Sequence, residues 1–377
     1  MRIGIDARFY GPRFGGGGLG RYVSELVTHL QLIDTDNEYV LFLRKENFHE
    51  CEIVNPRFSK RLVDIPWYTV QEQRQMPGHV RRARVDVMHY PHWNIPVFSK
   101  TPFIVTIHDL ILLQDKASAR SSTRHPLIHG FKYAGFRTVL ENAIHRSKHI
   151  ISVSQYTKDT ILDHFGLHSD KITVVPNGVI PQRESRGVNL TALGVYQPYF
   201  LYVGNAYPHK NLEMMMHAFA QFHPHHPHVQ LVIAGRRDLF SHNLEKEASE
   251  LGLAPGAVRF VDLPTDEEVA ALYKNAALFI FPSRIEGFGI PPLEALSYGT
   301  PVAAAHSASL PEVLRDGARY FDPDDIEKLT LLMRDATEAP HRFDDSIHAG
   351  KSQVDRFTWM KSAKQTLKVY NELSLLD

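Results

Sequence analysis

The sequence predicts an α/β protein made of two Rossmann-like domains, each with a parallel sheet. Three observations support this class. Short apolar runs alternate with longer stretches of helical spacing along most of the chain, which is typical of parallel sheets covered by helices on both faces. The alternation lapses in a polar segment at 181–187 and then restarts. The length of 377 residues suits two domains of ordinary size.

The first domain is expected to span residues 1–195. Two segments between its strands have clear helical spacing, at 19–30 and 127–143. The expected strands are residues 3–5, 40–43, 86–89, 103–107, 150–153 and 172–175.

The second domain is expected to span residues 196–356, with strands at 200–203, 229–234, 278–281 and 302–304. The closing segment 357–373 is an amphipathic helix with Trp359 and Tyr370 on one side. Its periodicity does not show which domain it packs on. Ligands of open parallel sheets bind beyond the carboxyl ends of the strands, so we expect two such domains to face each other across a cleft.

The composition excludes several classes of protein. The single cysteine, Cys51, excludes a disulfide framework and a cysteine-based zinc site, which fits a reducing compartment. No apolar run approaches the roughly 20 residues that span a bilayer, and the first residues do not form the apolar core of a signal peptide. We therefore expect a cytoplasmic protein.

The zero net charge hides an asymmetry between the two halves. Residues 1–195 carry 25 basic and 18 acidic side chains, and residues 196–377 carry 17 and 24. The excess is concentrated at 74–148, with 12 basic and 4 acidic side chains. This face either rests on anionic lipid, at the inner face of the membrane, or is simply solvated. Nearby His125, Phe131, Tyr133 and Phe136 suit the first alternative. No nucleic-acid partner is expected.

A glycine-rich segment at 15–22 joins the first strand to the first helix. Glycines at such a junction let a ligand approach the backbone, and the N–H groups at the helix start favour a phosphate. The spacing does not match the dinucleotide-binding fingerprint. Gly17 and Gly18 are therefore candidates for phosphate contact, and the alternative is a flexible surface loop.

The segment 281–296 carries the most informative pattern. A strand ends near Phe281, a loop containing Gly287 and Gly289 follows, and two prolines mark a helix start. Glu286 lies in the loop and Glu294 is expected in the first helical turn, so both carboxylates can line one pocket. Such a pocket offers acceptors to sugar hydroxyls and amides to phosphate oxygens, whereas the alternative is that the acids only cap the helix.

Two further strand ends carry polar residues. Lys210 follows the strand at 200–203 and a turn, where its charge can meet a diphosphate, although such a lysine is usually just solvated. His108 and Asp109 directly follow the strand at 103–107 and can orient a hydroxyl or share a proton. A structural histidine is an equally good interpretation of His108. Asn177-Gly178 is expected to form a tight turn at the domain boundary.

Three other motifs are given structural interpretations. The Asp34-Thr35-Asp36 segment precedes a strand, at the end of the sheet away from the expected site, so we do not expect a metal there. The histidine-rich segment 223–228 is broken by prolines and is expected to be a solvated loop. The acidic run 322–325 is expected to cap the helix that follows it.

The motifs and their order along the chain resemble those of the retaining glycosyltransferases of family 4, also called glycosyl transferases group 1. Members of this family have the GT-B fold. The likeness covers nearly the whole chain. It rests on GGGGLGRY near the start, TIHDL at 106–110, VVPNGV at 174–179, GNAYPHKN at 204–211, EGFGIPPLE at 286–294 and the final helix.

The resemblance implies a role for each of these residues. Lys210 would bind the donor diphosphate, Glu286 the sugar hydroxyls and Glu294 the nucleotide ribose. Gly17 and Gly18 would add phosphate or sugar contacts, and His108 would lie near the transferred sugar. The amides of the loop and helix start would contribute as well, at Gly287, Phe288, Gly289 and Ile290. The final helix would cross back to the first domain.

The same resemblance implies a hexosyltransferase that uses a nucleotide-sugar donor of the GDP or UDP type, needs no metal or other cofactor, and retains the anomeric configuration. The sugar is a hexose such as mannose, by the likeness of PHKN to mannosyltransferases. The acceptor would be a glycan or a lipid-linked molecule held by loops near Trp67, Trp93 and residues 115–130.

One position departs from the family pattern. Asn205 stands where many members have an arginine that adds positive charge for the diphosphate. Asn205 remains a candidate donor contact, and Arg236 or Arg237 is a candidate for the missing charge.

Two alternatives to glycosyl transfer are kept. One is a nucleotide-sugar epimerase or a phosphorylase of the same fold. The other is a non-catalytic scaffold that only binds a nucleotide sugar, which the presence of Lys210, Glu286 and Glu294 together disfavours.

Overall fold

The computed structural model describes residues 1–11, 17–115, 126–180, 182, 185 and 187–373. The chain forms two compact units. The first comprises Met1–Leu110, Ser122–Gly178 and Trp359–Asp377, and the second comprises Ile111–Ser121 and Val179–Thr358. The units therefore divide after Gly178, whereas the sequence predicted a division after residue 195. Residues 179–195 belong to the second unit because Val179 pairs with Thr358 as an isolated bridge and donates its N–H to the Phe357 carbonyl at 2.9 Å.

The first unit is built on a seven-stranded parallel sheet in the order β3-β2-β1-β4-β5-β6-β7. Six of these strands lie where apolar runs predicted them. The seventh, β3, was missed because it is an edge strand whose residues are mostly polar and only partly buried. The strands are β1 (Arg2–Asp6), β2 (Glu38–Leu43), β3 (Phe58–Leu62), β4 (Val87–Tyr90), β5 (Phe103–Ile107), β6 (His149–Ser152) and β7 (Ile172–Val174).

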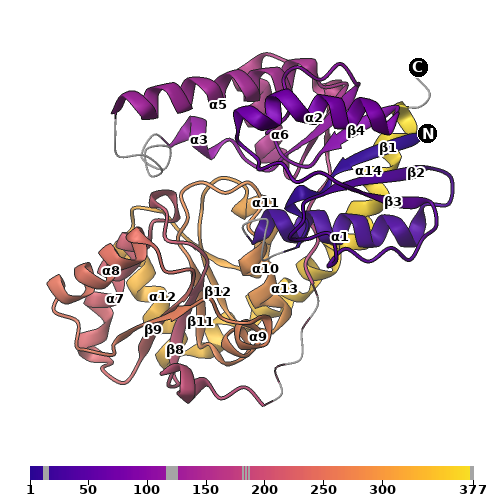
Figure 1. Ribbon diagram of the computed structural model, residues 1–377. Helices are drawn as coiled ribbons and strands as arrows, with labels where there is room; N and C mark the ends of the chain where they lie inside the picture. The colour runs from indigo at the N-terminus through magenta and orange to yellow at the C-terminus, as the bar shows by residue number, and fades with distance from the viewer. Residues whose placement is uncertain (12–16, 116–125, 181, 183–184, 186, 374–377) are drawn as a thin grey trace. The chain divides into compact units, whose positions relative to one another are not determined.

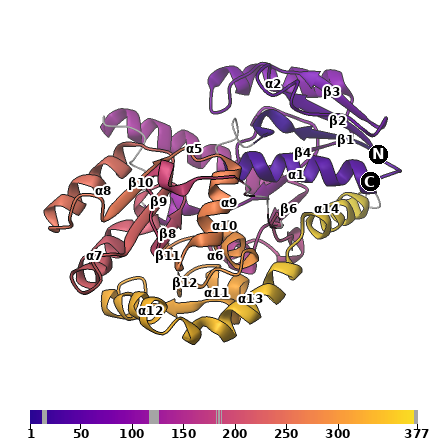
Figure 2. The ribbon, with the colours of Figure 1, turned by 90° about the horizontal axis from the view of Figure 1, so that it is seen from below.

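Helices cover this sheet, and the C-terminal helix is one of them. Helix α14 packs along α1, as Figure 2 shows. The helices of the first unit are α1 (Gly18–Ile33), α2 (Val70–Ala83), α5 (Pro126–Arg146), α6 (Gln155–Phe165) and α14 (Trp359–Leu373), with the short helices η1 (Ala7–Phe9) and η2 (Ser169–Lys171).

A buried polar network fixes α14 to the first sheet. The Tyr370 hydroxyl lies 2.6 Å from Nδ1 of His89 in β4, and Nε2 of His89 lies 2.8 Å from the Thr106 hydroxyl. Tyr22 of α1 completes the chain at 3.0 Å from Thr106. Gly178 lies so close to the Trp359 backbone that a Cβ added to Gly178 would be 2.2 Å from the backbone nitrogen of Trp359. The start of α14 therefore requires glycine at this turn.

The second unit is built on a six-stranded parallel sheet in the order β10-β9-β8-β11-β12-β13. The four central strands were predicted. The two edge strands, β10 and β13, were missed because charged residues interrupt their apolar residues. The strands are β8 (Tyr199–Val203), β9 (Gln230–Gly235), β10 (Val258–Asp262), β11 (Leu278–Phe281), β12 (Val302–Ala305) and β13 (Arg319–Phe321).

Helices α7, α8 and α12 lie on one side of the second sheet and α9, α10 and α13 on the other (Figure 1). The unit contains α3 (Ile111–Gln114), α7 (Leu212–Phe222), α8 (Leu239–Glu250), α9 (Asp266–Asn275), α10 (Ile290–Ser297), α11 (Leu310–Leu314), α12 (Ile326–Glu338) and α13 (Asp344–Arg356). Its short helices are η3 (Leu190–Leu193), η4 (Pro208–Lys210), η5 (His223–His225), η6 (Arg315–Gly317) and η7 (Pro340–Phe343).

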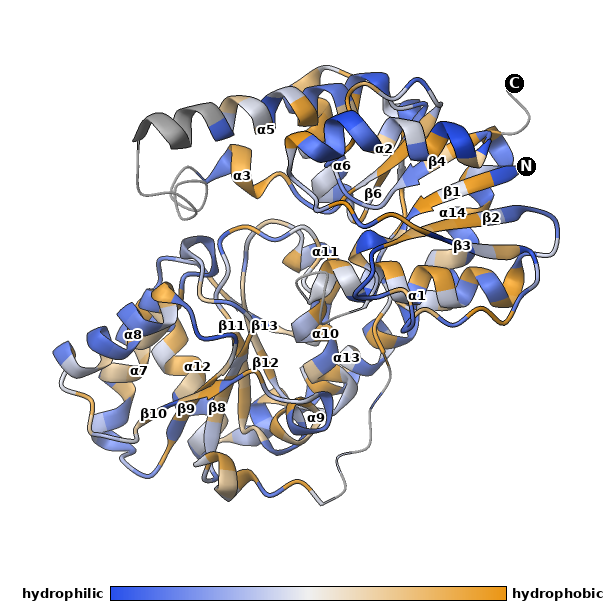
Figure 3. Ribbon diagram, in the orientation of Figure 1, coloured by the Kyte–Doolittle hydropathy of each residue, from blue (hydrophilic) through white to orange (hydrophobic). Residues whose placement is uncertain are grey.

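The cores lie on the faces of the two sheets. The central strands are mostly apolar and buried, whereas the residues after their carboxyl ends are more polar (Figure 3). In each sheet the strand order reverses beside the first strand, between β1 and β4 and between β8 and β11. Ligands of such sheets bind at this switch point, because the flanking connections run to opposite sides and leave the strand ends accessible.

No helix among the described residues is long and apolar enough to cross a membrane.

Candidate active site

The candidate site lies at the switch point of the second sheet. Lys210 ends η4 in the connection after β8, and Glu286 lies in the loop after β11. Because β8 and β11 are hydrogen-bonded neighbours, the two connections leave the same edge of the sheet. Lys210 and Glu286 therefore lie at the same edge of the sheet, where the strand pattern predicted polar residues.

Lys210 and Glu286 form an ion pair between Nζ and Oε1. Their side chains are only 14% and 10% exposed, so the pair is largely shielded from water. The Lys210 ammonium also lies 5.7 Å from the centroid of the Phe281 ring. The pair places a cation and a carboxylate together, which lets the site contact an anionic group and hydroxyl groups side by side.

The connections that carry this pair are fixed by hydrogen bonds between loops. Asn211 adopts a left-handed conformation, with φ of 59°, between η4 and α7. Its side-chain amide donates to the carbonyls of Pro282, at 3.2 Å, and Pro323, at 2.8 Å. The Ser309 hydroxyl donates to the Glu286 carbonyl at 3.0 Å. These contacts keep the two sides of the site in register before any ligand binds.

The loop 282–289 ends at Gly289, a position whose backbone conformation and close neighbours require glycine. Gly289 precedes α10 with φ of 86°, and an added Cβ would lie 2.7 Å from Leu310 Cδ2. Pro291 and Pro292 then occupy the first turn, as predicted, and have no N–H to donate. The backbone donors near this helix start therefore come from the loop residues and Ile290. Phe288 contributes no side chain, since its ring is 4% exposed and packs edge-on against Phe357 at 5.2 Å.

Glu294 lies one turn farther into α10 than predicted, beyond the first helical turn. Its Oε2 accepts a hydrogen bond from the Tyr273 hydroxyl of α9 at 3.1 Å. Tyr273 itself is 1% exposed and stacks on Tyr298 with 5.8 Å between ring centroids. The carboxylate is thus held in a fixed direction by a rigid aromatic neighbour.

Burial shapes the electrostatics around the pair. His209 is neutral because burial, together with the neighbouring Lys210 charge, lowers its pKa to about 4. Burial and the Glu286 charge raise the pKa of Tyr202 well above its usual value. Tyr202 therefore stays a hydroxyl, and it donates to the Asn205 carbonyl at 2.7 Å. The positive charge that pairs with Glu286 therefore comes from Lys210.

Asn205, which stands at the position of the missing arginine, and the two arginines that could supply its charge differ in their surroundings. Asn205 is exposed, with its carbonyl held by Tyr202. Arg237 forms an ion pair with Glu245, and its backbone N–H donates to Asp262 at 2.9 Å. Arg236 is exposed after β9. Since Glu245 already neutralises Arg237, Arg236 is the better candidate for a second positive charge.

Three predicted residues belong to the first unit. His108 follows β5, is partly exposed, and lies with Nε2 2.9 Å from the Pro91 carbonyl. Burial lowers its pKa to about 4, so the ring is neutral at physiological pH. Gly17 and Gly18 begin α1, and no described atom lies within 4 Å of a Cβ added to either. The neighbouring Gly15 and Gly16 lie outside the described residues, as do His125 and residues 116–124.

Sequence reasoning missed the residues that hold the site in place. Tyr273 and Tyr202 read as core aromatics, and their sequence positions carry no sign of the Glu294 and Asn205 contacts. Asn211 did carry a signal, because asparagine between a turn and a helix favours the left-handed conformation. Ser309 carried none, since it lies 23 residues from Glu286 in the sequence.

The motifs given structural interpretations have the following surroundings. Asp34 accepts hydrogen bonds from the backbone of Asp36 and Asn37 and from the Tyr39 hydroxyl. Asp325 caps α12 as predicted. The prediction of a solvated loop at 223–228 was partly wrong, because His223 is 8% exposed and stacks on Phe219. Among the described residues, no group of three or more His, Cys, Asp or Glu side chains could hold a metal ion.

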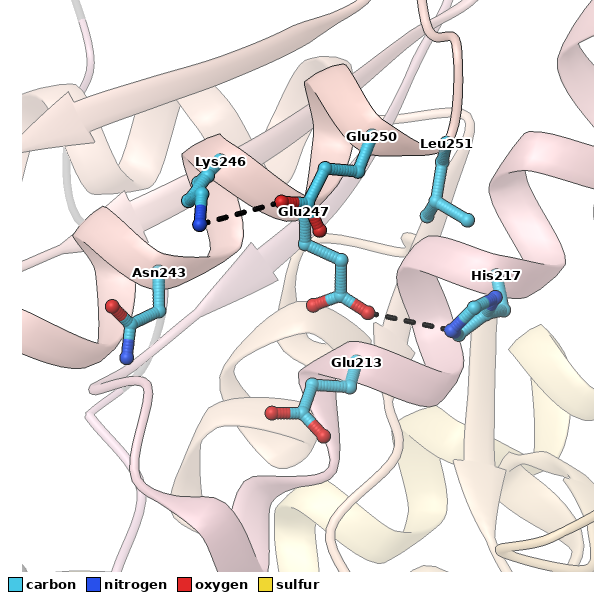
Figure 4. Close-up of a pocket in the computed structure, with 7 residues that line it drawn as sticks. All are labelled: Glu213, His217, Asn243, Lys246, Glu247, Glu250 and Leu251. Carbon is cyan, nitrogen blue, oxygen red and sulfur yellow. Dashed lines mark ion pairs between the residues drawn. The ribbon is translucent and has the colours of Figure 1, made fainter.

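A separate pocket of about 430 Å³ lies between α7 and α8 (Figure 4). Glu247 pairs with His217 at 3.4 Å, and Lys246 with Glu250 at 3.4 Å. Burial, with the Glu213 charge adding to it, raises the pKa of Glu247. An acidic lining of this kind repels a diphosphate. The pocket therefore does not replace the site at Lys210 and Glu286.

Comparison with known proteins identifies the family. The family described as "Glycosyl transferases group 1" matches residues 191–353, and "Glycosyltransferase Family 4" matches residues 16–183. The O-antigen chain mannosyltransferase RfbU of Salmonella typhimurium is 31% identical over 315 residues, covering 81% of this chain and 79% of the relative. The chain belongs to the glycosyl transferases group 1 family.

A second relative is similar along nearly its whole length. The O-antigen chain mannosyltransferase B of Escherichia coli is 26% identical over 385 residues, covering 94% of this chain and 96% of the relative. Glycosyl transferases group 1 are enzymes, and this chain is accordingly a hexosyltransferase.

Solved structures show the same fold. Sucrose-phosphate synthase from Thermosynechococcus elongatus aligns with a TM-score of 0.78 at 19% identity, covering 100% of both chains. Anabaena HepE, solved in complex with UDP and glucose, aligns with a TM-score of 0.74 at 16% identity, covering 99% of this chain and 100% of that one. These likenesses establish the GT-B fold for this glycosyl transferases group 1 member.

Proposed function

We propose that this glycosyltransferase moves a hexose, mannose, from a nucleoside-diphosphate sugar to a glycan or lipid-linked acceptor, with retention of the anomeric configuration. The observation that carries the proposal is the shielded Lys210–Glu286 ion pair at the switch point of the second sheet. The names of the relatives support mannose as the sugar. The HepE complex with UDP and glucose supports a nucleotide-sugar donor.

Each side chain has a role in this proposal. Lys210 binds the diphosphate as a point charge, and Glu286 accepts hydrogen bonds from hydroxyls of the donor sugar. Glu294, oriented by Tyr273, accepts hydrogen bonds from the ribose. Backbone N–H groups at Gly287, Gly289 and Ile290 supplement Lys210.

In the first unit, Gly17 and Gly18 lie at the start of a helix, where backbone N–H groups favour phosphate oxygens. His108 is neutral and partly exposed, which suits a hydrogen bond to the transferred sugar. We assign these residues to the donor on that basis.

The chemistry follows from charge development. The bond between the anomeric carbon and the diphosphate oxygen breaks, and negative charge grows on the leaving group while the sugar becomes oxocarbenium-like. The acceptor oxygen bonds to the same face of the sugar and passes its proton to the leaving phosphate. Preorganised donors stabilise this transition state more than the ground state. Because Lys210 and amides supply those donors, we propose that the reaction uses no metal or other cofactor.

A nucleotide screen tests the proposal. A ligand that binds only the folded protein at 100 times its Kd stabilises it by about 2.7 kcal/mol. We expect GDP or UDP to raise the melting temperature by several degrees and ADP to have less effect. Glu294→Gln should reduce this rise more than Glu247→Gln, a control in the acidic pocket of Figure 4. If none of the three nucleotides shifts the melting temperature, the proposal is wrong.

A nucleotide sugar of the base found in this screen also serves to distinguish a transferase from a phosphorylase, an epimerase and a scaffold. With the nucleotide sugar that binds, a phosphorylase would cleave glycan in inorganic phosphate, and an epimerase would convert the sugar nucleotide without releasing nucleoside diphosphate. A scaffold would bind without turnover. The proposed transferase releases nucleoside diphosphate and forms a new glycosidic bond with an α-anomer from an α-donor, which one-dimensional NMR of the product measures.

Location at the cytoplasmic face of a membrane is part of the proposal, and its support is the excess of 12 basic over 4 acidic side chains at 74–148. Flotation with phosphatidylglycerol vesicles tests it. We expect binding that disappears at high salt, whereas salt-insensitive binding or none would leave the basic residues as an ordinary solvated face.

A further inference from the structure

Five rings gather at the switch point of the first sheet, and we call them the aromatic platform: Phe9, Trp67, Tyr68, His92 and Trp93. Phe9 follows β1, and His92 and Trp93 follow β4, its neighbour in the sheet. The platform thus occupies the first unit's equivalent of the position that Lys210 and Glu286 occupy in the second. This is where the topology of an open parallel sheet places a ligand.

The rings form one continuous surface. Trp67 packs against Phe9 with 4.5 Å between centroids and 30° between ring planes, and Tyr68 lies 5.4 Å from Trp93. His92 lies 4.7 Å from Trp93 and 5.8 Å from Phe9. Phe9 is 3% exposed and forms the base, whereas Tyr68 is 54% exposed and forms the outer edge.

Tyr68 is held in a conformation that costs free energy. Its φ is 62°, a left-handed value that a bulky aromatic residue rarely adopts. Folding does not require the exposed ring to be buried, so core packing does not explain the strain. Strained residues at a site persist when their surroundings over-determine them, and they often mark a functional constraint.

A buried polar cluster holds Tyr68 in place. Glu72 is 0% exposed, and its Oε2 accepts the Tyr68 backbone N–H at 2.9 Å. Arg8, also 0% exposed, pairs with Glu72 and with Asp6, the latter at 2.6 Å. The Asn94 amide donates to both Glu72 oxygens at 2.9 Å. Because Asn94 lies in the loop that carries His92 and Trp93, the cluster joins the two sides of the platform.

Polar groups for hydroxyl recognition lie beside the rings. Although 54% of Tyr68 is exposed, its hydroxyl group is largely desolvated, and this raises its pKa, with the charges of Glu72 and Asp109 adding to the effect. The Asp109 carboxylate therefore lies near the Tyr68 hydroxyl. His108 Nε2 lies 2.9 Å from the carbonyl of Pro91, the residue before His92. Burial lowers the pKa of His92 to about 3, so its ring is a neutral hydrogen-bonding group. The platform therefore combines apolar ring faces with carboxylate and imidazole groups.

This combination suits a pyranose, which has an apolar face of C–H groups and a rim of hydroxyls. The charges nearby argue against lipid phosphate. Arg8 is outnumbered by Asp6, Glu72 and Asp109, and Arg44, whose guanidinium lies 4.9 Å from the centroid of the Trp67 ring, is already paired with Glu46 and Asp64. A phosphate at this position would meet net negative charge, whereas sugar hydroxyls can donate to it.

We propose that the aromatic platform binds a pyranose ring of the acceptor glycan, with Tyr68 stacking on the sugar and Glu72 acting as a positioning residue for Tyr68. This inference rests on the proposed function, since it names the binding surface of the acceptor in that reaction.

The test measures saccharide binding without any donor. Saturation-transfer NMR and tryptophan fluorescence are recorded with methyl α-mannopyranoside, α-linked mannobiose, galactose and N-acetylglucosamine, and in a separate arm with phosphatidylglycerol vesicles. The variants are Tyr68→Gly, which removes the ring and suits the positive φ, and Tyr68→Phe, which keeps the ring. Tyr196→Ala in the second unit is the matched control, because Tyr196 is 57% exposed against 54% for Tyr68.

We expect at least one saccharide to bind the wild type, with its affinity lowered about fivefold or more in Tyr68→Gly, as for loss of one aromatic contact. Tyr68→Phe and Tyr196→Ala should bind as the wild type does. Tyr68→Gly should keep the wild-type melting temperature and its shift by GDP or UDP.

Three results would overturn the inference. The first is that no saccharide binds the wild type at any concentration up to its solubility limit. The second is that Tyr68→Gly binds saccharides as well as the wild type does, and the third is that Tyr68→Gly weakens binding to the vesicles but not to any saccharide. The proposed function fails separately, by the absence of any nucleotide-induced shift. A protein that binds GDP but no saccharide would therefore contradict the platform alone.

Discussion

At the scale of single residues, the ion pair between Lys210 and Glu286 is the central feature of the second unit. Each charge compensates the other in surroundings that are mostly closed to water. Removing one partner leaves an uncompensated, partly buried charge, which costs more than the pair contributes when intact. Each of the two side chains therefore depends on the other for compensation of its charge.

A double-mutant cycle checks this interdependence. We expect Lys210→Met to lower the free energy of unfolding by about 1–3 kcal/mol, because Glu286 loses its partner. The combined Lys210→Met and Glu286→Gln variant should be less destabilised than the sum of the two single variants. Urea unfolding measures all four proteins. Strict additivity would show that the two side chains are not coupled in solution. The exposed Arg284–Asp324 pair is the control, and removing it should change the free energy of unfolding much less than Lys210→Met does.

The sequence predicted some of these residues and not others, for physical reasons. Glycine and proline after a strand mark where a chain must turn, so the loop of Glu286 and the turn before Lys210 were predictable. The supporting contacts are not encoded nearby. Tyr273 and Ser309 reach the site through tertiary packing, and the strain at Tyr68 depends on Glu72 and Arg8 folding around it.

At the scale of elements, burial decided which strands were predictable. The central strands are mostly apolar because helices cover both of their faces. The strands β3, β10 and β13 lie at sheet edges, where Lys60 and Arg61, Arg259, and Arg319 replace the apolar run. An edge strand needs charge to discourage pairing with other chains, and this charge hides it from a hydropathy pattern.

The C-terminal helix gives the prediction at this scale. Tyr370→Phe removes a buried hydroxyl and leaves Nδ1 of His89 without the hydrogen bond that it now makes. We expect a loss of about 1–2 kcal/mol in the free energy of unfolding, as for a buried polar group left unsatisfied. Chemical denaturation monitored by tryptophan fluorescence checks this. The exposed Tyr196→Phe variant should show no such loss, and an equal loss in both would contradict the role of the network.

At the scale of the whole molecule, buried histidines make folding stability depend on pH. Burial, with a smaller contribution from the neighbouring His108, lowers the pKa of His89 to about 3, and the pKa values of His108 and His209 are lowered to about 4. An unfolded histidine titrates near 6.5. The unfolded chain therefore binds more protons below that pH, and folding stability falls as the pH decreases from about 6.5 toward 4.

The slope of this loss is measurable. Each histidine that stays neutral in the fold contributes up to about 1.4 kcal/mol per pH unit in that range. We expect His89→Gln to reduce the slope of the free energy of unfolding against pH between 6 and 4.5. His242→Gln, at a side chain that is 79% exposed, should leave the slope unchanged. A slope unchanged in His89→Gln would mean that His89 is charged in the folded protein.

The sequence also predicted the two-domain α/β architecture and its family, because alternating strands and helices and the order of motifs persist along the whole chain. The exact division was not predictable. The polar stretch after Val179 reads as a linker, but the chain joins the second unit earlier, where Val179 pairs with Thr358 across 179 positions of sequence. Long-range pairing of this kind leaves no local pattern.

The central claim is that Lys210 and Glu286 form the site of sugar transfer. The most direct measurement is the rate at which nucleoside diphosphate is released from the sugar nucleotide that stabilises the wild type, compared among the wild type, Lys210→Ala, Glu286→Ala and the Glu247→Gln control. We predict a fall of about 100-fold or more in both site variants, as for loss of a preorganised group at the reacting centre, with circular dichroism unchanged and the control fully active. Near-normal rates in both folded variants would contradict the claim.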